Sequence, residues 1–480
     1  MGKNKDEFVK EITNIEDDFA QWYTDIVLKA ELADYTDIKG FIAIRPYGFA
    51  IWEAIRDYTD KKFKELGVEN LYMPELIPES MLQKEKDHVE GFAPEVAWVT
   101  IGGQQELEEK LCVRPTSETI MSTMYAKWVS SWRDLPIIGN QWCSVLRWEK
   151  ETRPFLRSRE FLWQEGHTIH ETAEEAEKLT LDMLDVYADV IENLLAVPVI
   201  KGRKTPKEQF AGAEATYTVE TMTYDGRALQ SGTSHYFGQN FSKPYEIKFQ
   251  NREGKEEYAY QTSWGSSTRL IGALIMAHGD NRGLKLPPKV APIQVVIVPI
   301  AQHKEGVLEK VNAIYDGMKS KFRVKLDDRD NYSTGYKFND WEMKGVPVRV
   351  EIGPRDLENE EAVLVRRDTL EKETVKLTEL DDRIEKLLDE IQTNMYNQCK
   401  ARQDDRTTVA HSLDEMLKQI NEKQGFIKTM WCGDVECENK IKEVTGAHSR
   451  CMPYNQEKLG DTCPVCGKKA TKMVIWGRQY

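Results

Sequence analysis

Apolar positions recur with a helical period in three stretches of the first half of the chain. Residues 46–66 begin with a proline and are followed by a glycine, as expected of a helix with these residues at its ends. Residues 172–195 carry an apolar face, and Thr172 and Glu175 at their start match a capping box. Residues 265–279 are apolar enough to predict a buried helix.

Alternating apolar and polar positions predict strands between these helices. Residues 141–148 and 159–168 alternate in this way. Residues 216–224 and 227–237 flank an Asp-Gly pair, which is a strong hairpin signal. These elements predict an α+β domain over residues 1–285, with helices on one side of an antiparallel sheet.

The pattern changes after a proline-rich linker that starts at Pro287. Residues 294–300 form a continuous apolar run, typical of a buried strand, and a helical pattern and two more strands follow. This spacing predicts an α/β domain over residues 286–398. An acidic helix over residues 383–403 leads into residues 399–480, which we expect to form a small α+β domain.

The last part carries two cysteine pairs at metal-ligand spacing. Four residues separate the first pair, two separate the second, and a glycine follows one member of each pair. Four thiolates suit a closed tetrahedral structural Zn²⁺ site, built from Cys432, Cys437, Cys463 and Cys466. Cys451 is a spare or an alternate ligand, and the other cysteines are expected to be small buried hydrophobic residues.

Composition and charge limit the class of protein. The chain has 480 residues, 40% of them hydrophobic, and a net charge of −14 that lies mainly in residues 1–285, whereas residues 399–480 are weakly basic. This acidity argues against a general nucleic-acid binder but leaves room for a local polyanion site. No apolar run approaches the ~20 residues that a membrane span needs, and residues 1–10 contain no secretory leader. We therefore expect a cytoplasmic protein with no membrane partner.

One stretch, residues 147–168, combines charge and aromatic character. It reads RWEKETRPFLRSREFLWQEGHT, with four arginines before an aromatic run. A solvated face would not carry Phe-Leu-Trp, and a core strand would not carry four arginines. The stretch therefore predicts one half-site for an anion and one for a small ligand with an apolar body. For Arg153 and Arg159, a salt bridge that pairs the strands is an alternative.

The same stretch resembles motif 2 of the class II aminoacyl-tRNA synthetases. Residues 67–77, GVENLYMPELI, look like motif 1; residues 265–280, GSSTRLIGALIMAHGD, look like motif 3; and residues 114–119, RPTSET, look like the TSE motif of class IIa members. With QSGTSH at 230–235, the cysteine module and the final tyrosine, the set is similar to the prolyl-tRNA synthetase family in its archaeal and eukaryotic form. The resemblance covers essentially the whole chain, without the large insertion that bacterial members carry between motifs 2 and 3.

The resemblance implies ATP-dependent attachment of L-proline to tRNA(Pro) through prolyl-adenylate, with release of AMP and pyrophosphate. Negative charge develops on phosphoryl oxygens, so guanidinium groups would provide the catalysis. Arg147 would hold the α-phosphate, Arg157 the β- and γ-phosphates, and Arg269 the phosphates from the other side, while Mg²⁺ shields their charge. The implied ATP-binding residues are Arg147, Glu149, Arg157, Gln230, Ser267 and Arg269, with Glu149 facing the adenine.

Proline is a compact apolar ring with a secondary ammonium, so its pocket needs flat walls and a carboxylate beside an acceptor hydroxyl. Trp163, Glu165 and His167 lie two residues apart on one face of the second predicted strand, as a pocket wall requires. By resemblance, Thr116 and Glu118 contact the ammonium. The implied proline-binding residues are Thr116, Glu118, Arg147, Trp163, Glu165, His167, Thr233 and His235, with a buried core histidine as the alternative for the last.

The middle domain resembles the anticodon-binding domain that several class IIa enzymes share. Glu342 and Arg349 are seven residues apart across a Gly-Val-Pro turn. Arginine contacts guanine O6 and N7 and glutamate accepts from exocyclic amines, which fits the two guanines of proline anticodons. Lys372 is a third candidate, and an ordinary salt bridge is the alternative for the pair.

The overall prediction is a homodimeric enzyme that pairs through its motif 1 surface. A class IIa synthetase for threonine is the nearest alternative, but its pocket uses a catalytic metal, and residues 1–285 contain no His/Cys cluster to hold one. A non-catalytic synthetase-like protein is a second alternative, although it would have no reason to keep Arg147, Arg157 and Arg269. A zinc-dependent nucleic-acid binder is the third, and the cysteine module is too small a part of the chain to favour it.

Overall fold

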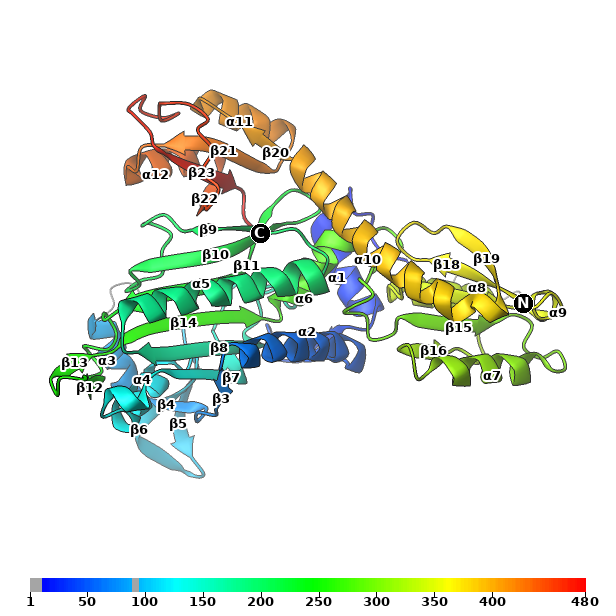
Figure 1. Cartoon of the computed structure of the whole chain (residues 1–480), viewed down its shortest axis with the longest axis horizontal. Coiled ribbons are helices and arrows are strands. Elements are labelled where there is room, and N and C mark those ends of the chain that lie inside the picture. Colours follow the sequence, from blue (N-terminus) through cyan, green and yellow to red (C-terminus); the bar gives the residue numbers. More distant parts are fainter. Residues whose placement is uncertain (1–10, 89–94) are drawn as a thin grey trace.

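The structure is a computed structural model that describes residues 11–88 and 95–480; residues 1–10, in which no leader is predicted, lie outside the described residues. Figure 1 shows a large sheet with its helices, a smaller sheet and a C-terminal part, with one long helix running from the second to the third. This arrangement confirms the predicted α+β class. Among the described residues, no helix combines the length and the apolar character that crossing a bilayer requires.

The central sheet is antiparallel along most of its width. The predicted hairpin is confirmed, and Gly226 in its turn has a positive φ of 84°. The predicted helix over 265–279 is shorter, because residues up to Ser267 pair with the neighbouring strand. The strands, in sheet order, are β9 (Ile200–Arg203), β10 (Ala215–Met222), β11 (Ala228–Gly238), β14 (Tyr260–Ser267), β8 (Glu160–His170), β7 (Ile137–Leu146) and the parallel edge strand β3 (Glu69–Asn70).

The main core lies between this sheet and its helices. α5 (Ala173–Asp189) packs across four of the strands and continues as a π-helical turn, Val190–Leu194. One of the two hydrogen bonds of the predicted capping box is present, because the Thr172 hydroxyl accepts a hydrogen bond from the Glu175 amide at 3.2 Å. The Glu175 carboxylate does not complete the box and lies beside His170. The helices that share this core are α1 (Phe19–Lys29), α2 (Pro46–Glu65) and α6 (Arg269–His278).

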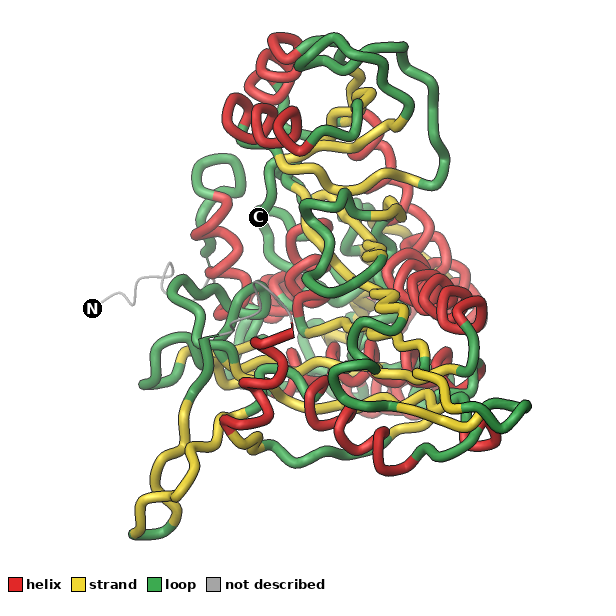
Figure 2. Tube along the Cα trace, turned by 90° about the vertical axis from the view of Figure 1, so that its left-hand side faces the viewer, coloured by secondary structure: helices red, strands yellow, loops and turns green. Residues whose placement is uncertain are grey.

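Shorter elements extend the first domain. A three-stranded sheet projects from the body of the molecule (Figures 1 and 2). It consists of β4 (Leu76–Pro78), β6 (Gln105–Val113) and β5 (Trp98–Gly102). The remaining elements are β1 (Ala33–Tyr35), β2 (Ile42–Ile44), α3 (Glu79–His88), α4 (Glu118–Trp128), the 3-10 turn Trp132–Asp134, β12 (Lys248–Gln250) and β13 (Glu256–Tyr258).

The middle domain contains the predicted alternation of strands and helices. One inner strand, β15 (Val295–Pro299), is parallel to both of its neighbours, and the pairs β17–β18 and β18–β19 are antiparallel. In sheet order the strands are β16 (Val324–Leu326), β15 (Val295–Pro299), β17 (Val348–Ile352), β18 (Glu361–Arg366) and β19 (Lys372–Lys376). The helices are α7 (Val307–Met318), α8 (Thr334–Met343), α9 (Pro354–Glu358) and the 3-10 turn Leu377–Glu379.

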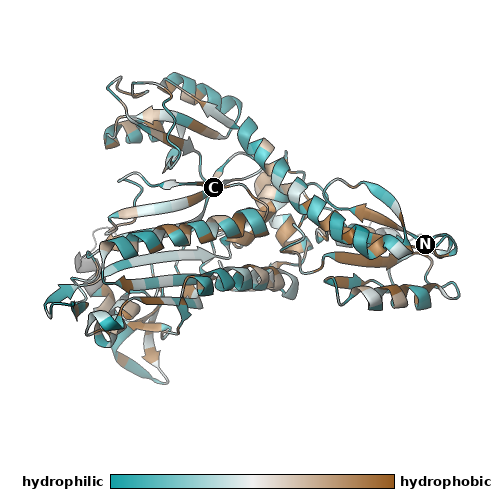
Figure 3. Ribbon diagram, in the orientation of Figure 1, coloured by the Kyte–Doolittle hydropathy of each residue, from teal (hydrophilic) through white to brown (hydrophobic). Residues whose placement is uncertain are grey.

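The long helix α10 (Leu380–Asp405) spans the position at which the last domain is predicted to begin. Its outward face in Figure 3 is mostly hydrophilic, whereas its buried face packs on the middle domain. The C-terminal sheet joins the central sheet, because β22 pairs with β9 and so makes one sheet of 11 strands. The C-terminal elements are β20 (Thr407–Val409), α11 (Leu413–Glu422), β21 (Phe426–Trp431), α12 (Val435–Thr445), β22 (His448–Pro453) and β23 (Lys472–Gly477).

Candidate active site

A cavity of about 320 Å³ opens over strands β8, β11 and β14. The cavity is lined by most of the residues that the sequence predicts to bind proline or ATP. These residues come from segments far apart in the chain. Trp163, Glu165 and His167 share one face of β8, as the alternation predicts. The predicted residues on its walls are Thr116, Glu118, Arg147, Trp163, Glu165, His167, Gln230, Thr233, His235, Ser267 and Arg269.

Glu165 is a buried carboxylate of this cavity that accepts several hydrogen bonds. Its Oε2 accepts hydrogen bonds from the Thr116 hydroxyl at 2.8 Å, the Ser117 amide at 2.8 Å and His167 Nε2 at 3.0 Å, and its side chain is 2% exposed. Burial raises the pKa of Glu165, but His167 and the Ser117 donors outweigh this effect and lower the pKa to about 2. Glu165 is therefore ionised at neutral pH and fixes the segment that precedes Glu118.

Aromatic side chains form the flat walls of the cavity. Trp163, Phe161 and His167 lie along β8, and His235 faces them from β11. His235 Nδ1 lies 3.0 Å from the Thr216 hydroxyl, and its ring is 4.8 Å from the Phe210 ring. Burial and the nearby His167 lower the pKa of His235 to about 3, so the ring is neutral. His235 is thus both hydrogen-bonded and on the cavity wall.

Three arginines bring guanidinium groups together at one end of the site. Arg147 Nε donates to the Pro115 carbonyl at 3.1 Å, and Arg269 Nε donates to the Leu156 carbonyl at 3.3 Å. Burial lowers the pKa of Arg269, and the positive charges of Arg157 and Arg147 lower it further. These like charges repel one another unless an anion lies between them, so the arrangement suits a polyphosphate.

Arg157 lies on a second cavity of about 400 Å³, which shares Gln230 and Arg269 with the first. The loop that carries Arg157 is closed by two backbone hydrogen bonds. The Arg157 amide donates to the Arg153 carbonyl at 2.9 Å, and the Arg153 amide donates to the Arg157 carbonyl at 2.7 Å. The C-terminal Tyr480 forms part of the same cavity wall.

Among the residues that the structure describes, the other two arginines of this stretch do not form the salt bridge that the sequence allowed as an alternative. In the described part of the chain, Arg153 donates to the Tyr480 hydroxyl. Arg159 donates to the Glu149 carbonyl at 3.1 Å and stacks on Trp148. Burial lowers the pKa of Arg147, and the charges of Glu165, Glu149 and Glu118 oppose this effect only in part. Glu149 lines neither cavity.

Sequence reasoning missed several residues that line the two cavities. Lys204, Glu208 and Phe210 line the first cavity from the loop after β9, and Arg450 and Gln479 line the second from the C-terminal part. The loop has no periodic pattern, and the C-terminal residues lie hundreds of positions away from motif 2. The sequence therefore carries no local signal for these residues.

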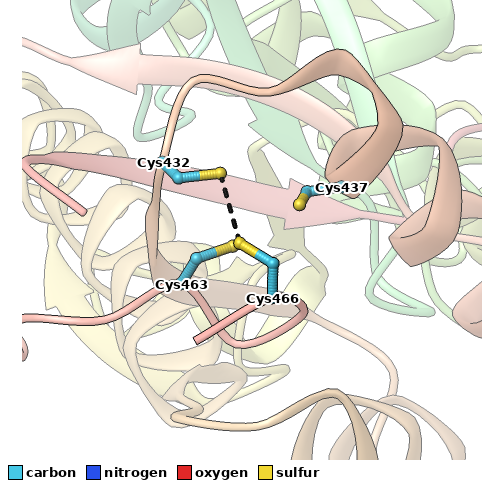
Figure 4. Close-up of side chains that lie close together, drawn as sticks. All are labelled: Cys432, Cys437, Cys463 and Cys466. Atoms are coloured by element: carbon cyan, nitrogen blue, oxygen red, sulfur yellow. Dashed lines mark hydrogen bonds between the residues drawn. The ribbon is translucent and has the colours of Figure 1, made fainter. Parts of the chain in front are cut away.

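The four predicted cysteine ligands come together in the C-terminal part, and Figure 4 shows their sulfur atoms facing one another. All four Sγ atoms lie within 4.8 Å of each other, and those of Cys432 and Cys466 are 3.8 Å apart. Zn–S bonds of about 2.3 Å in a tetrahedron place sulfur atoms about 3.8 Å apart, so the geometry fits Zn²⁺. Gly433 and Gly467 have positive φ values of 94° and 69°, which form the predicted tight turns.

Cys451 is separate from this group. It is fully buried on β22, and burial raises the pKa of its thiol to about 12. Within the described ranges, the cluster contains only the four predicted cysteines. Cys451 is therefore the spare cysteine and not an alternate ligand, because β22 directs its side chain toward Gly202 of the central sheet.

In the middle domain, Glu342 and Arg349 form an ion pair with a distance of 2.9 Å, which is the contact that the sequence left open as the alternative to base recognition. Arg349 also pairs with Glu351 at 2.9 Å, and Lys372 reaches the same carboxylate at 3.2 Å. The Arg349 guanidinium lies 4.0 Å from the Phe338 ring, an aromatic residue that sequence reasoning missed. This face of the five-stranded sheet therefore combines charged groups with an aromatic ring, a combination that RNA-reading surfaces use.

An antiparallel sheet with an arginine-bearing strand–loop–strand unit, and a second arginine at the start of an apolar helix, defines a class II aminoacyl-tRNA synthetase core. Consistent with this geometry, residues 98–278 match the family described as tRNA synthetase class II core domain (G, H, P, S and T). Residues 294–387 match the anticodon binding domain, and residues 413–480 match the prolyl-tRNA synthetase C-terminal domain.

Whole-length relatives identify the family. The chain is 60% identical to Proline--tRNA ligase 2 of Clostridioides difficile (strain 630) and 59% identical to Proline--tRNA ligase of Alkaliphilus oremlandii (strain OhILAs), covering 100% of each chain. It is 44% identical to a solved prolyl-tRNA synthetase from Cryptosporidium parvum, complexed with halofuginone and AMPPNP, with a TM-score of 0.94 over 98% of this chain and 99% of that one. The chain belongs to the prolyl-tRNA synthetase family.

Proposed function

We propose that this protein activates L-proline with ATP and transfers the prolyl group from prolyl-adenylate to tRNA(Pro), releasing AMP and pyrophosphate. The observation that carries the proposal is the convergence of three guanidinium groups beside a small aromatic cavity that contains an ionised, buried carboxylate. The guanidinium groups suit a polyphosphate, and the aromatic cavity with its carboxylate suits a compact amino acid with an apolar side chain and an ammonium group. The relatives named proline--tRNA ligase share this whole chain length.

The arginines would provide the chemistry of the first step. A substrate carboxylate is already ionised, so no general base is required, and stabilisation of the developing phosphoryl charge is the main demand. Arg147 lies between the aromatic wall and Pro115, where the α-phosphate would meet the amino acid. Arg157 and Arg269 lie on the second cavity, which would take the β- and γ-phosphates, and Gln230, Ser267 and Glu149 would contribute to ATP binding.

Proline would bind between Trp163, His167 and His235, with its ammonium toward Thr116 and Glu118. Glu165 accepts the Thr116 hydroxyl hydrogen, and the Glu118 amide donates to the same hydroxyl at 3.3 Å, so its second lone pair can accept from the ammonium. Glu165 would therefore act through Thr116 and Ser117 and not by direct contact. Thr233 would close the cavity from β11.

Two metal ions belong to the proposal. The four cysteine thiolates would hold a structural Zn²⁺, which joins α12 to the turn before β23. When Mg²⁺ is bound with ATP, it supplies positive charge that neutralises phosphate oxygens. The three arginines described above would orient those oxygens.

The middle domain would bind the anticodon. Glu342, Arg349 and Lys372 would contact guanine edges, and the Phe338 ring between them offers a stacking surface. Their ion pairs hold the side chains in place before RNA arrives, and an incoming base would have to replace some of these contacts.

The proposed assembly is a homodimer through the motif 1 surface, located in the cytoplasm. Tyr72, Leu76 and Trp98 expose 73%, 39% and 43% of their surfaces near motif 1, which supports a protein partner there. All eight cysteines lack disulfide partners, which fits a reducing compartment.

Pyrophosphate exchange tests the proposal. The purified protein, ATP and labelled pyrophosphate would be incubated with each of the twenty amino acids in turn. Exchange should depend on proline far more than on any other amino acid, and tRNA(Pro) should then accept the prolyl group. Exchange that depends on threonine instead, or no exchange with any amino acid, would contradict the proposed function.

A further inference from the structure

A buried ion cluster joins the central sheet to the C-terminal part. Glu220 on β10 is fully buried, and its Oε1 accepts from Lys204 Nζ at 2.9 Å and the Thr218 hydroxyl at 2.8 Å. Its Oε2 accepts from Arg450 Nε and Nη2 at 2.9 and 2.8 Å. Lys204 and Arg450 are also buried, at 4% and 3% exposure. Removing one member of such a cluster leaves an uncompensated charge, so the three groups hold one another in place.

The cluster reaches both cavities of the candidate active site. Lys204 lines the first cavity, and Arg450 lines the second. The third nitrogen of Arg450, Nη1, donates to Gln479 Oε1 at 2.9 Å, and Gln479 also lines the second cavity. Across the strand pair, Glu220 lies opposite Gln230, which lines both cavities. The Glu220 carboxylate therefore holds in place side chains that line each of the two cavities.

A β-bulge at Val219 and Glu220 accompanies this arrangement. Bulges redirect side chains and often lie beside active sites. Burial raises the pKa of Glu220, but Arg450 and Lys204 outweigh burial and keep the pKa below its usual range. The carboxylate is thus ionised and can hold both cations.

A second buried contact ties the same loop to the C-terminal part. Glu438 on α12 is 1% exposed, and its Oε1 accepts from the Thr205 hydroxyl at 2.9 Å and from the Ser449 hydroxyl. Gly202 packs so closely on β22 that an added Cβ would lie 2.4 Å from the Met452 carbonyl oxygen. The backbone that leads into the pocket-lining loop is therefore held from the C-terminal side as well.

We propose that Glu220 is a positioning residue for amino-acid activation, and that through Arg450 the C-terminal part sets the place of Lys204 and Gln479 on the walls of the two cavities. The inference rests on the proposed function. It makes the C-terminal part a contributor to the first, tRNA-independent step, in addition to any role in stability.

Pyrophosphate exchange by the full-length protein, without tRNA, tests the inference. The variants are Glu220→Gln, Arg450→Met and Arg450→Lys. The matched control is Arg367→Met, because Arg367 is a buried arginine that pairs with Asp280 at 2.7 Å across another domain boundary and lines neither cavity. All assays run well below the lowest melting temperature, so that loss of stability does not reduce the folded fraction.

Arg450→Met should lower kcat/KM in exchange by about 10- to 100-fold, the cost of a small misplacement of site residues. Arg450→Lys keeps the charge and should recover part of this loss, whereas Arg367→Met should stay within about twofold of wild type although its melting temperature falls. Because Glu220 acts through Arg450, the double variant Glu220→Gln with Arg450→Met should be no worse than Glu220→Gln alone.

The outcomes are distinct. If Arg450→Met and Arg367→Met show the same exchange kinetics, the cluster is a structural tie and the inference is wrong. If Glu220→Gln does not fold, Arg450→Lys decides, because it retains the buried charge. Exchange below that of wild type supports the inference, and exchange equal to wild type contradicts it. A wild-type protein without proline-dependent exchange would contradict the proposed function, whereas an active wild type with unaffected Arg450 variants contradicts this inference alone.

Discussion

Replacement of Glu165 by glutamine should impair proline activation while leaving ATP binding nearly intact. The carboxylate accepts hydrogen bonds from Thr116, Ser117 and His167 and is almost completely buried. Glutamine has nearly the same shape, but its amide nitrogen is a donor and would face other donors. At the Oε2 position the amide nitrogen would face Thr116, Ser117 and His167, and at the Oε1 position it would face the Ser117 amide, which donates there at 3.0 Å. In either orientation at least one hydrogen bond to the carboxylate would be lost, and with it part of the support of the segment that carries Thr116.

The size of the effect follows from these bonds. A hydrogen bond to a charged group contributes about 1.5–3 kcal/mol, so losing one should lower kcat/KM for proline by about 10- to 150-fold. The KM for ATP should change little, because Glu165 lies at the amino-acid end of the cavity. Pyrophosphate exchange measured against proline at saturating ATP, and against ATP at saturating proline, separates the two.

The pKa of Glu165 adds a pH test. Its folded pKa is about 2, below the ordinary value of 4.5, so its stabilising contribution is fully present above pH 4.5 and is lost as the pH falls toward 2. The shift corresponds to about 3 kcal/mol at neutral pH. The difference in free energy of unfolding between wild type and Glu165→Gln should therefore shrink as the pH falls below about 4.5.

Glu160→Gln is the matched control, because Glu160 begins the same strand and is exposed. It should leave both KM values unchanged. A proline KM and kcat within about threefold of wild type in Glu165→Gln would refute the orienting role, since even one lost charged bond should exceed that change.

Three further predictions concern other parts of the molecule. Arg147→Ala should lower exchange by about 10²–10³-fold with a melting curve close to wild type, and near-normal exchange would exclude its role at the phosphate. Elemental analysis of natively purified protein should find one zinc per chain, and Cys463→Ser should lose the metal and melt earlier; a wild-type protein without zinc would refute the cysteine site. Glu342→Ala or Arg349→Ala should slow aminoacylation of tRNA(Pro) by about 10- to 100-fold without changing exchange, and the loss should shrink for a tRNA with a substituted anticodon guanine. An equal loss with both tRNAs would make the pair a structural salt bridge.

Much of the fold follows from local patterns. Proline and glycine at its ends mark α2, and Asp225-Gly226 marks the hairpin, because these residues determine backbone conformation over a few positions. The start of α6 was predicted four residues early. Residues 265–267 are apolar or small and fit either element, and pairing with β8 decides for the strand.

The candidate site was partly predictable. Residues on one strand face, such as Trp163 and His167, follow from a period of two, and the cysteine pairs follow from ligand spacing. Lys204 and Phe210 could not be identified in this way, because they lie in a loop without a period. Glu149 was predicted from its place in a specific motif, but it lines neither cavity, so a motif alone does not place a side chain in the site.

The sequence by itself determined which chemical groups the protein possesses and which neighbours share a strand, a helix or a turn, because those relations depend on short-range backbone geometry. The tertiary structure alone decided which distant groups meet. Glu220 and Arg450 are 230 positions apart, and Arg153 and Tyr480 are 327 positions apart. Such pairs form because β22 adds to the edge of the central sheet at β9, and strand order across domains has no local signature in the chain.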